Sequence, residues 1–321
     1  MEDRKKEIIV PLAVGVGFIL LFAVLLFHSP KSFEKSLNYI ESVSYDLSLR
    51  YRHKALSKDS PVIIIDVDDR SLAEEGRWPW SRKKMARLIS QLEHLGARVI
   101  ALDFLFPEPE RNLAEEVIDQ LKESRNGDLS VLNNLEQVKS AFDYDALFAK
   151  SLSATHAVLG FAFKEEGTSV GELPIPILSV TPEMEKWIEI PHAQSYLSNI
   201  ALLQTAVKEG GFINATPDLD GVIRFTPMLY RYGSQVYPSL SLAAVQLFLG
   251  NLEIKLLHAE YGFGTLMEGL QLGNIKIPTD PSGRSLIPFR GPPYSVPYFS
   301  AADLLKGTVS KEHIQGKLVF V

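Results

Sequence analysis

The sequence predicts an α/β protein in which a single N-terminal transmembrane helix precedes a mixed, partly parallel sheet with flanking helices. Two observations lead to this prediction. Residues 8–27 form an uninterrupted apolar run without a charge. From residue 61 onward, short β-branched segments alternate with segments whose apolar residues recur at helical spacing, which is the pattern of strands and helices that share a core.

The apolar run is long enough to cross a bilayer. As an α-helix its 20 residues extend about 30 Å, the thickness of the hydrocarbon core. Basic residues at 4–6 precede it, so the positive-inside rule predicts a cytoplasmic segment 1–7 and an extracytoplasmic segment 28–321. A cleaved signal peptide is the alternative, but its apolar region is shorter and ends at a small-x-small site, which residues 27–30 lack.

Composition and motif searches exclude several classes of protein. The chain is 46% hydrophobic and 22% charged, as in ordinary globular proteins, and its net charge of −6 gives no general basis for binding nucleic acid. It has no cysteine, which excludes disulfides and thiolate chemistry. No H-E-x-x-H pair, G-x-S-x-G elbow or glycine-rich phosphate loop occurs. We therefore expect no catalytic residue, no cofactor and no nucleic-acid partner.

Residues 28–52 are expected to form a juxtamembrane helix after the membrane span. Apolar residues recur there at spacings of three and four, which is helical. They are Phe33, Leu37, Ile40, Val43, Leu47 and Tyr51. The favoured interpretation is a stripe that packs on the parent domain. The alternative is a dimer seam that carries motion to the membrane.

A parallel strand–helix–strand unit is predicted between residues 61 and 106. Residues 61–68 and 98–106 are β-branched, apolar and short, like buried strands. Between them, Ser81 is a good N-cap, the apolar positions from 85 to 95 share one helix face, and Gly96 ends the helix. Such a crossover is right-handed in nearly all known sheets.

The remainder predicts further α/β structure without an internal repeat. Residues 107–142 read as a polar surface excursion with helices near 113–123 and 132–141. The other expected elements are helices at 143–152 and 238–250, strands at 157–163 and 222–232, a hairpin of 270–278 with 284–290, and a short helix from Ser300 to Gly307. Residues 317–321 read as the inside of an apolar strand, so we expect 53–321 to be a C-terminally truncated domain.

Three carboxylates are expected to meet at one edge of the predicted sheet. Asp66 and Asp68 lie near the end of the first strand, and Asp103 lies at the same end of what we expect to be its parallel neighbour. Ligands bind at this edge in open α/β sheets. The carboxylates could hold Mg²⁺ or Ca²⁺. They could also cap helices or pair with nearby arginines, and this second interpretation is favoured. We expect no resident metal.

Aromatic and basic residues beside this edge complete the candidate sensing site. Trp78 and Trp80 could form a ligand wall, although covering the helix entrance is the simpler explanation. Arg82 opens a basic stretch in the first turns of a helix, where cations oppose the helix dipole, so an acidic partner is expected nearby.

A second polar motif reads as a turn. Asn214, Asp218, Asp220 and Gly221 resemble the start of a calcium loop, but Leu229 stands where the last acidic ligand would be required. Asp and Gly are also the residues that a turn before a strand favours, and we prefer that interpretation.

Seven short motifs, none specific alone, occur in the order of one bacterial family. They lie at residues 45–52, 65–71, 76–82, 96–103, 211–214 with 218–222, 237–240 and 300–303. Together they resemble the type-two CHASE domain, an extracellular sensor associated with cyclases and histidine kinases. The resemblance implies one transmembrane helix before the domain, several after it, and a cytoplasmic output such as an adenylate or guanylate cyclase or a kinase.

We therefore expect the input domain of a membrane-bound bacterial receptor, with its output lying outside this chain. The expected partners are the lipid bilayer, a second copy in a homodimer, and an unidentified small-molecule or envelope signal. Asp66, Asp68, Asp103, Arg82, Trp78 and Trp80 are the sensing candidates. A membrane-anchored metal-dependent hydrolase using the same carboxylates, and a structural envelope protein without ligand, are the competing classes.

Overall fold

The structure is a computed structural model that describes residues 14–19, 24, 31–51, 60–123, 129–218 and 220–321. The chain divides into two compact units, which are described separately. One comprises Met1–Ala55 with Pro288–Gly291, and the other comprises Leu56–Ile287 with Pro292–Val321.

The first unit contains the helix predicted for residues 28–52, which is present as α2 (Lys31–Tyr51). Four of its apolar side chains, Ile40, Val43, Leu47 and Tyr51, are exposed. Residues 14–19 are helical. The segment 1–7 and most of the predicted span 8–27 lie outside the described residues. In the part of the chain that the structure describes, no helix combines the length and apolarity needed to cross a membrane.

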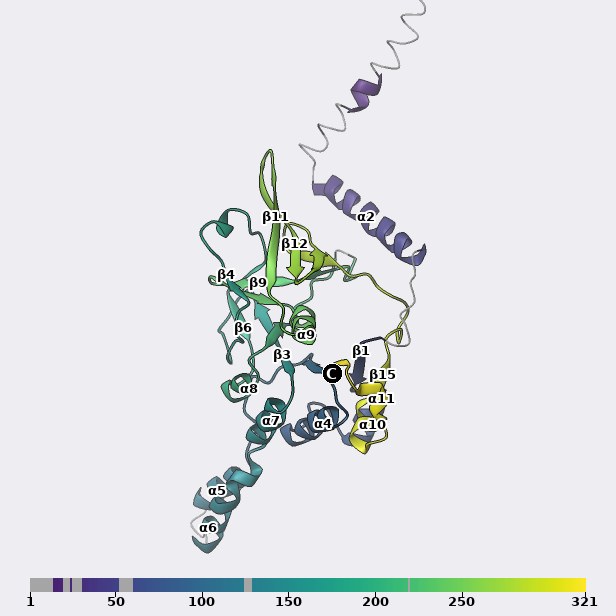
Figure 1. Cartoon of the computed structure of the whole chain (residues 1–321). Helices are drawn as coiled ribbons and strands as arrows, with labels where there is room; N and C mark the ends of the chain where they lie inside the picture. Colours follow the sequence, from purple (N-terminus) through teal and green to yellow (C-terminus); the bar gives the residue numbers. More distant parts are fainter. Residues whose placement is uncertain (1–13, 20–23, 25–30, 52–59, 124–128, 219) are drawn as a thin grey trace, which may run out of the picture. The chain divides into compact units, whose positions relative to one another are not determined.

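The second unit is built on a seven-stranded, mostly parallel sheet (Figure 1). Its strands run in the order β15 (Tyr298–Ser300), β1 (Val62–Asp66), β16 (Leu318–Phe320), β2 (Val99–Leu102), β3 (Ala157–Lys164) and β6 (Ser195–Leu197), with β7 (Gly210–Phe212) also paired to β3. All pairings are parallel except that of β3 with β6. Mixed α/β architecture with a partly parallel sheet is therefore confirmed.

One sequence expectation about this sheet is wrong. β1 and β2 are parallel, but they are not neighbours, because β16 lies between them. Leu318 pairs with both Val62 and Val99 in register. An apolar segment remote in sequence fills the gap because β1 and β2 each offer an unpaired backbone edge that must be satisfied inside the protein.

Helices cover both faces of the sheet (Figure 1). On one face lie α3 (Asp69–Glu75), α4 (Arg82–His94), α7 (Tyr144–Ser153), α8 (Ala201–Ala206), α10 (Ala301–Lys306) and α11 (Lys311–Ile314). The predicted apolar side of α4 is buried, and residues such as Leu88 and Leu92 pack with Ile100 and Leu102. On the other face, Leu240 and Ala244 of α9 (Leu240–Phe248) pack with the alternate residues of the same strands. β2 is buried on both faces, as a central parallel strand should be.

The polar excursion before α7 folds as a helical pair. It consists of α5 (Leu113–Glu123), α6 (Leu129–Val138) and a short 3-10 helix, η1 (Lys139–Phe142). Exposed ion pairs between Lys139 and Glu115 (2.8 Å) and between Lys122 and Glu136 (3.4 Å) join its parts. The two helices predicted here are confirmed.

Smaller sheets occupy the middle of the chain, and here the sequence predictions fail in two places. The remaining elements are β4 (Leu178–Ser179), η2 (Met184–Lys186), β5 (His192–Ala193), β8 (Phe225–Pro227), β9 (Leu229–Tyr232), β10 (Gln235–Pro238), β11 (Ile254–Tyr261), β12 (Gly264–Leu272), β13 (Ile275–Pro278) and β14 (Arg284–Leu286). The strand expected at 222–232 is two strands, since β8 pairs with β14 whereas β9 pairs with β10. Pro227 ends the first, because it has no N–H to continue a ladder.

The predicted hairpin of 270–278 with 284–290 is also wrong. The turn between them exists, with Gly283 donating its N–H to the Asp280 carbonyl at 2.9 Å. Its two flanks nevertheless pair with other strands, β13 with β12 and β14 with β8. The turn residues predict the local bend, but they do not predict which strand pairs with each flanking segment.

Candidate functional site

A pocket of about 480 Å³ opens where β1, β16 and β2 end. Asp66 is the last residue of β1, Val321 follows β16, and Asp103 follows β2, so the pocket lies at the carboxyl edge of the parallel sheet. This is the edge at which open α/β sheets bind ligands. The other lining residues are Ile64, Ile65, Val67, Leu72, Trp78 and Phe104.

Two of the three predicted carboxylates line this pocket. Asp66 is half-buried, and its backbone is paired in register with Ser300 of β15. Asp103 donates its backbone N–H to the Val321 carbonyl at 3.0 Å. Neither carboxylate has a hydrogen bond or ion pair to any residue that the structure describes. The protein around the Asp103 carboxyl raises its pKa, because burial disfavours the charged form, although the residue as a whole keeps an exposed surface.

An aromatic wall stands beside these carboxylates. The Trp78 ring meets the Phe104 ring edge to face, with centroids 5.2 Å apart, and both rings line the pocket. Trp80 is only 4% exposed, and its indole N–H donates to the Gly76 carbonyl at 2.8 Å. Trp80 therefore covers the start of α4, as the simpler sequence interpretation has it, and it does not line the pocket.

The expectation that Asp68 joins the other two carboxylates is wrong. Its Oδ1 accepts from the backbone N–H of Ser71 at 2.7 Å and from the Ser300 hydroxyl at 3.0 Å, so it caps α3. Burial alone would raise the pKa of Asp68, but the hydrogen bonds from Ser71 and Ser300 and the charge of Arg70 outweigh it and lower that pKa. The Asp68 carboxylate therefore serves as the N-cap of α3.

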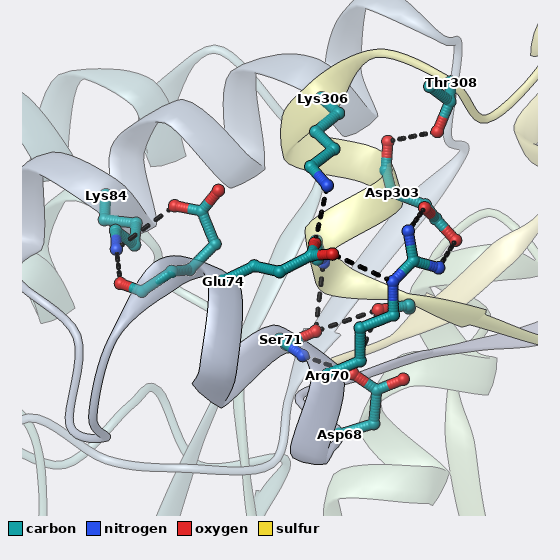
Figure 2. A network of polar contacts seen from close by, with 11 residues as sticks. Asp68, Arg70, Ser71, Glu74, Lys84, Asp303, Lys306 and Thr308 are labelled. Atoms are coloured by element: carbon teal, nitrogen blue, oxygen red, sulfur yellow. Dashed lines mark hydrogen bonds and ion pairs between the residues drawn. The ribbon is translucent and has the colours of Figure 1, made fainter.

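Ser71 also caps a second helix, α10. The Ser71 hydroxyl accepts from the backbone N–H of Ala302 at 3.0 Å, and it lies 3.0 Å from the Ser300 hydroxyl. Ser300 itself makes no side-chain cap to α10. Ser71, in the first turn of α3, thus satisfies a backbone N–H at the start of α10, far away in the chain (Figure 2).

An ion-pair network extends this seam between α3 and α10 (Figure 2). Arg70 contacts both carboxylate oxygens of Asp303, at 2.9 and 3.1 Å, and contacts Glu74 at 3.2 Å. Glu74 also pairs with Lys306 at 2.7 Å. The sequence motifs at 65–71 and 300–303 thus form one structural joint.

Arg82 also lies outside the pocket, which corrects its assignment to the sensing edge. Its Nε contacts Asp145 Oδ1 at 3.0 Å, its Nη2 donates to the Glu108 carbonyl at 2.8 Å, and its guanidinium lies 4.3 Å from the centre of the Phe106 ring. Its backbone N–H donates to Glu110 at 2.8 Å. Arg82 is mostly buried and joins α4 to α7 and to the segment after β2.

The acidic partners expected for the basic start of α4 are present. Besides the Arg82 pair with Asp145, Lys84 pairs with Glu75 at 3.2 Å. Arg87 donates to the Leu305 carbonyl at 2.6 Å, near the C-terminus of α10, where a cation is favourable.

The residues of the second polar motif make contacts within the protein. Asn214 bonds both the N–H and the carbonyl of Phe163 at 2.8 Å. Gly221, at φ +81°, donates to the Asp218 carbonyl. Asp218 and Asp220 pair with the buried Arg224 at 3.1 and 2.8 Å. Asp218 and Asp220 thus hold the turn against the guanidinium of Arg224.

Sequence reasoning missed Phe104 and the aliphatic lining of the pocket. Phe104 directly follows Asp103, just past the end of β2, and this position at the carboxyl edge of the sheet could have identified it as a lining residue. No group of three or more His, Asp or Glu side chains able to hold a metal occurs within the described ranges.

Comparison with known proteins supports the resemblance seen in the motifs. No curated protein and no solved structure matches the chain. The family model of the CHASE2 domain matches residues 18–321, which is most of the sequence. The chain therefore belongs to the CHASE2 family, whose members are extracellular sensory domains of signalling receptors.

Proposed function

We propose that this chain is the extracytoplasmic input domain of a membrane-bound receptor and that it receives its signal in the pocket at the carboxyl edge of β1, β16 and β2. One observation carries the assignment of the site. Asp66 and Asp103 enter a pocket with aromatic walls and have no partner among the described residues, whereas Asp68 and Arg82 are used in structural contacts. Groups that a fold leaves unsatisfied in a pocket are the groups that a ligand contacts.

We also propose that residues 8–27 anchor the chain and that the output lies on the cytoplasmic side. The uncharged apolar run and the basic residues 4–6 support this orientation. A nucleotide cyclase or a protein kinase is the class of output that such an input domain would regulate. A bound signal changes the output only if it binds one conformation better than the other, typically by about 1–3 kcal/mol.

The helix α2 is the proposed route to the membrane and the proposed dimer contact. Ile40, Val43, Leu47 and Tyr51 recur at spacings of three and four and are exposed, so they form an apolar stripe on this helix. A second copy of α2 would cover such a stripe in a parallel pair.

Cysteine labelling tests the proposed topology sharply, because the chain has no cysteine of its own. Ser153, an exposed residue at the end of α7, and Glu2 are each replaced by cysteine in the membrane-bound protein. In spheroplasts, a membrane-impermeant maleimide should label Ser153→Cys, and it should label Glu2→Cys only after permeabilisation. Protection of Ser153→Cys in spheroplasts would overturn the proposed function.

A further inference from the structure

The pocket carries negative charge that none of the described residues neutralises. Asp66 and Asp103 line it, and its lining contains no lysine, arginine or histidine from the part of the chain that the structure describes. Arg70, which is close to Asp66 in the sequence, pairs with Asp303, and Arg82 pairs with Asp145. Burial raises the pKa of Asp103, which is the cost of holding its carboxylate here without a counter-charge. A cation would therefore complement the charge of this lining.

A hard metal ion would find carboxylate ligands in this lining only from Asp66 and Asp103, among the described residues. Mg²⁺ and Ca²⁺ require six or more oxygen ligands, and the two carboxylates are the acidic groups that line the pocket. The remaining lining is aliphatic and aromatic carbon, including Leu72 and the Trp78 and Phe104 rings. Such a wall supplies no oxygen ligand, so water would complete the shell of a metal and the apolar surface would remain without a ligand contact.

An organic cation can contact both the two carboxylates and the apolar residues of the lining. An ammonium group forms charge-assisted hydrogen bonds with carboxylates, and its attached carbon atoms can lie against aliphatic residues. The Trp78 and Phe104 rings offer a large apolar surface to those carbon atoms. A volume of about 480 Å³ lies within the range of small-molecule sites.

We propose that the pocket binds a small organic ammonium ion, with its charged nitrogen between Asp66 and Asp103 and its apolar body against Trp78 and Phe104. This inference rests on the proposed function, because it names the class of signal for the same site. Ligands of this class are amines with an apolar substituent, whether free or at the end of a larger molecule.

The test uses phenethylammonium as the probe on the purified full chain in detergent. Isothermal titration compares it with 2-phenylethanol, which is neutral, and with phenylacetate, which is an anion. We expect phenethylammonium to bind at least about tenfold more tightly than 2-phenylethanol, as charge-assisted hydrogen bonds imply. Calcium and magnesium chloride are titrated in parallel.

Variants assign the binding to the pocket. Asp66→Asn and Asp103→Asn should each weaken phenethylammonium binding by about tenfold, the loss of one charged partner. Trp78→Leu should weaken it as well. Asp119→Asn, an exposed carboxylate on α5, is the matched control and should bind like the wild type. Circular dichroism and the unfolding midpoint identify any variant that fails to fold.

Three outcomes would overturn the proposal. They are no binding of phenethylammonium by the wild-type chain at millimolar concentration, equal binding of 2-phenylethanol, and unchanged binding in both Asp66→Asn and Asp103→Asn. Binding of calcium alone that is lost in Asp66→Asn would replace the organic cation with a metal. None of these results changes the cysteine-labelling result, so a wrong ligand class is distinguishable from a wrong function.

Discussion

The Ser71 hydroxyl accepts the backbone N–H of Ala302 at 3.0 Å, so a residue of α3 caps α10 from 231 positions away. Ser71 is fully buried, and the same hydroxyl contacts Ser300. Helix caps normally come from the residue just before the helix. Here the cap is tertiary, and it joins the start of α3, next to the pocket strand β1, to the helix that follows β15.

Removal of this cap should destabilise the domain markedly. Ser71→Ala leaves a buried N–H of Ala302 without its acceptor, and we expect a loss of about 1–3 kcal/mol in the free energy of unfolding. Arg70→Gln, in the same seam, should lose much less, because that ion pair is exposed and screened. Urea unfolding followed by circular dichroism measures both. Equal losses in the two variants would contradict the tertiary cap.

A glycine in β7 sets the distance between the sheet and α9. A Cβ added at Gly211 would lie 2.4 Å from the Leu240 backbone, so the helix would have to move away. We expect Gly211→Ala to cost about 1–3 kcal/mol, the usual range for overpacking. Gly262→Ala is the control, because a Cβ there meets nothing within 4 Å. Thermal unfolding of the two variants should separate them clearly, and similar midpoints would show that α9 shifts at no cost.

The turn around Arg224 predicts sensitivity to acid. Hydrogen bonds from the Arg224 guanidinium lower the pKa of Asp220 from 3.8 to about 2. A lowered carboxyl pKa contributes stability that is present above the ordinary value and is lost as the pH falls through about 2. In Asp220→Asn, the decrease in unfolding free energy between pH 4 and about 2 should be shallower than in the wild type. Urea titrations at several pH values test this, and parallel curves would contradict it.

Asp103 should have the opposite effect on stability. Its pKa is raised by burial, so the native state holds its proton more tightly than the unfolded chain, and stability falls as the pH rises through this window. Asp103→Asn should therefore raise the unfolding midpoint at neutral pH, and the gain should vanish below the ordinary pKa of 3.8. Asp119→Asn serves as the exposed control. A lower midpoint in Asp103→Asn would mean that the carboxylate stabilises the empty pocket.

Cross-linking tests the proposed dimer seam on α2. Val43→Cys places a thiol within the apolar stripe, whereas Ser42→Cys places one on the opposite side of the helix. In membranes, mild oxidation should link Val43→Cys into a disulfide-bonded dimer and leave Ser42→Cys monomeric. Equal cross-linking at both positions would indicate random collision.

The elements with a strong periodic pattern were predictable, and their partners were not. The apolar face of α4 and the β-branched runs of β1 and β2 record burial directly in the sequence. The insertion of β16 between β1 and β2 depends on pairing between remote segments, which periodicity does not encode. β7 escaped notice because Gly210 and Gly211 have low strand propensity and are required there by close packing.

The candidate site was predictable to the same degree. The position at the ends of parallel strands indicates Asp66 and Asp103, and both line the pocket. Asp68 is only two residues from Asp66, yet it turns to cap a helix, and Arg82 finds a buried partner in Asp145. Proximity in sequence identifies the edge of the sheet, but the competition among polar partners decides which side chains remain free.

The placement of β16 between β1 and β2 has a consequence for biosynthesis. β1 and β2 are made early, and the strand that joins them emerges from the ribosome much later. Until then, each presents an apolar strand with an unpaired edge, the state most prone to aggregation. We therefore expect the incomplete sheet to need protection from aggregation during synthesis. The central sheet is complete only after β16 pairs with β1 and β2.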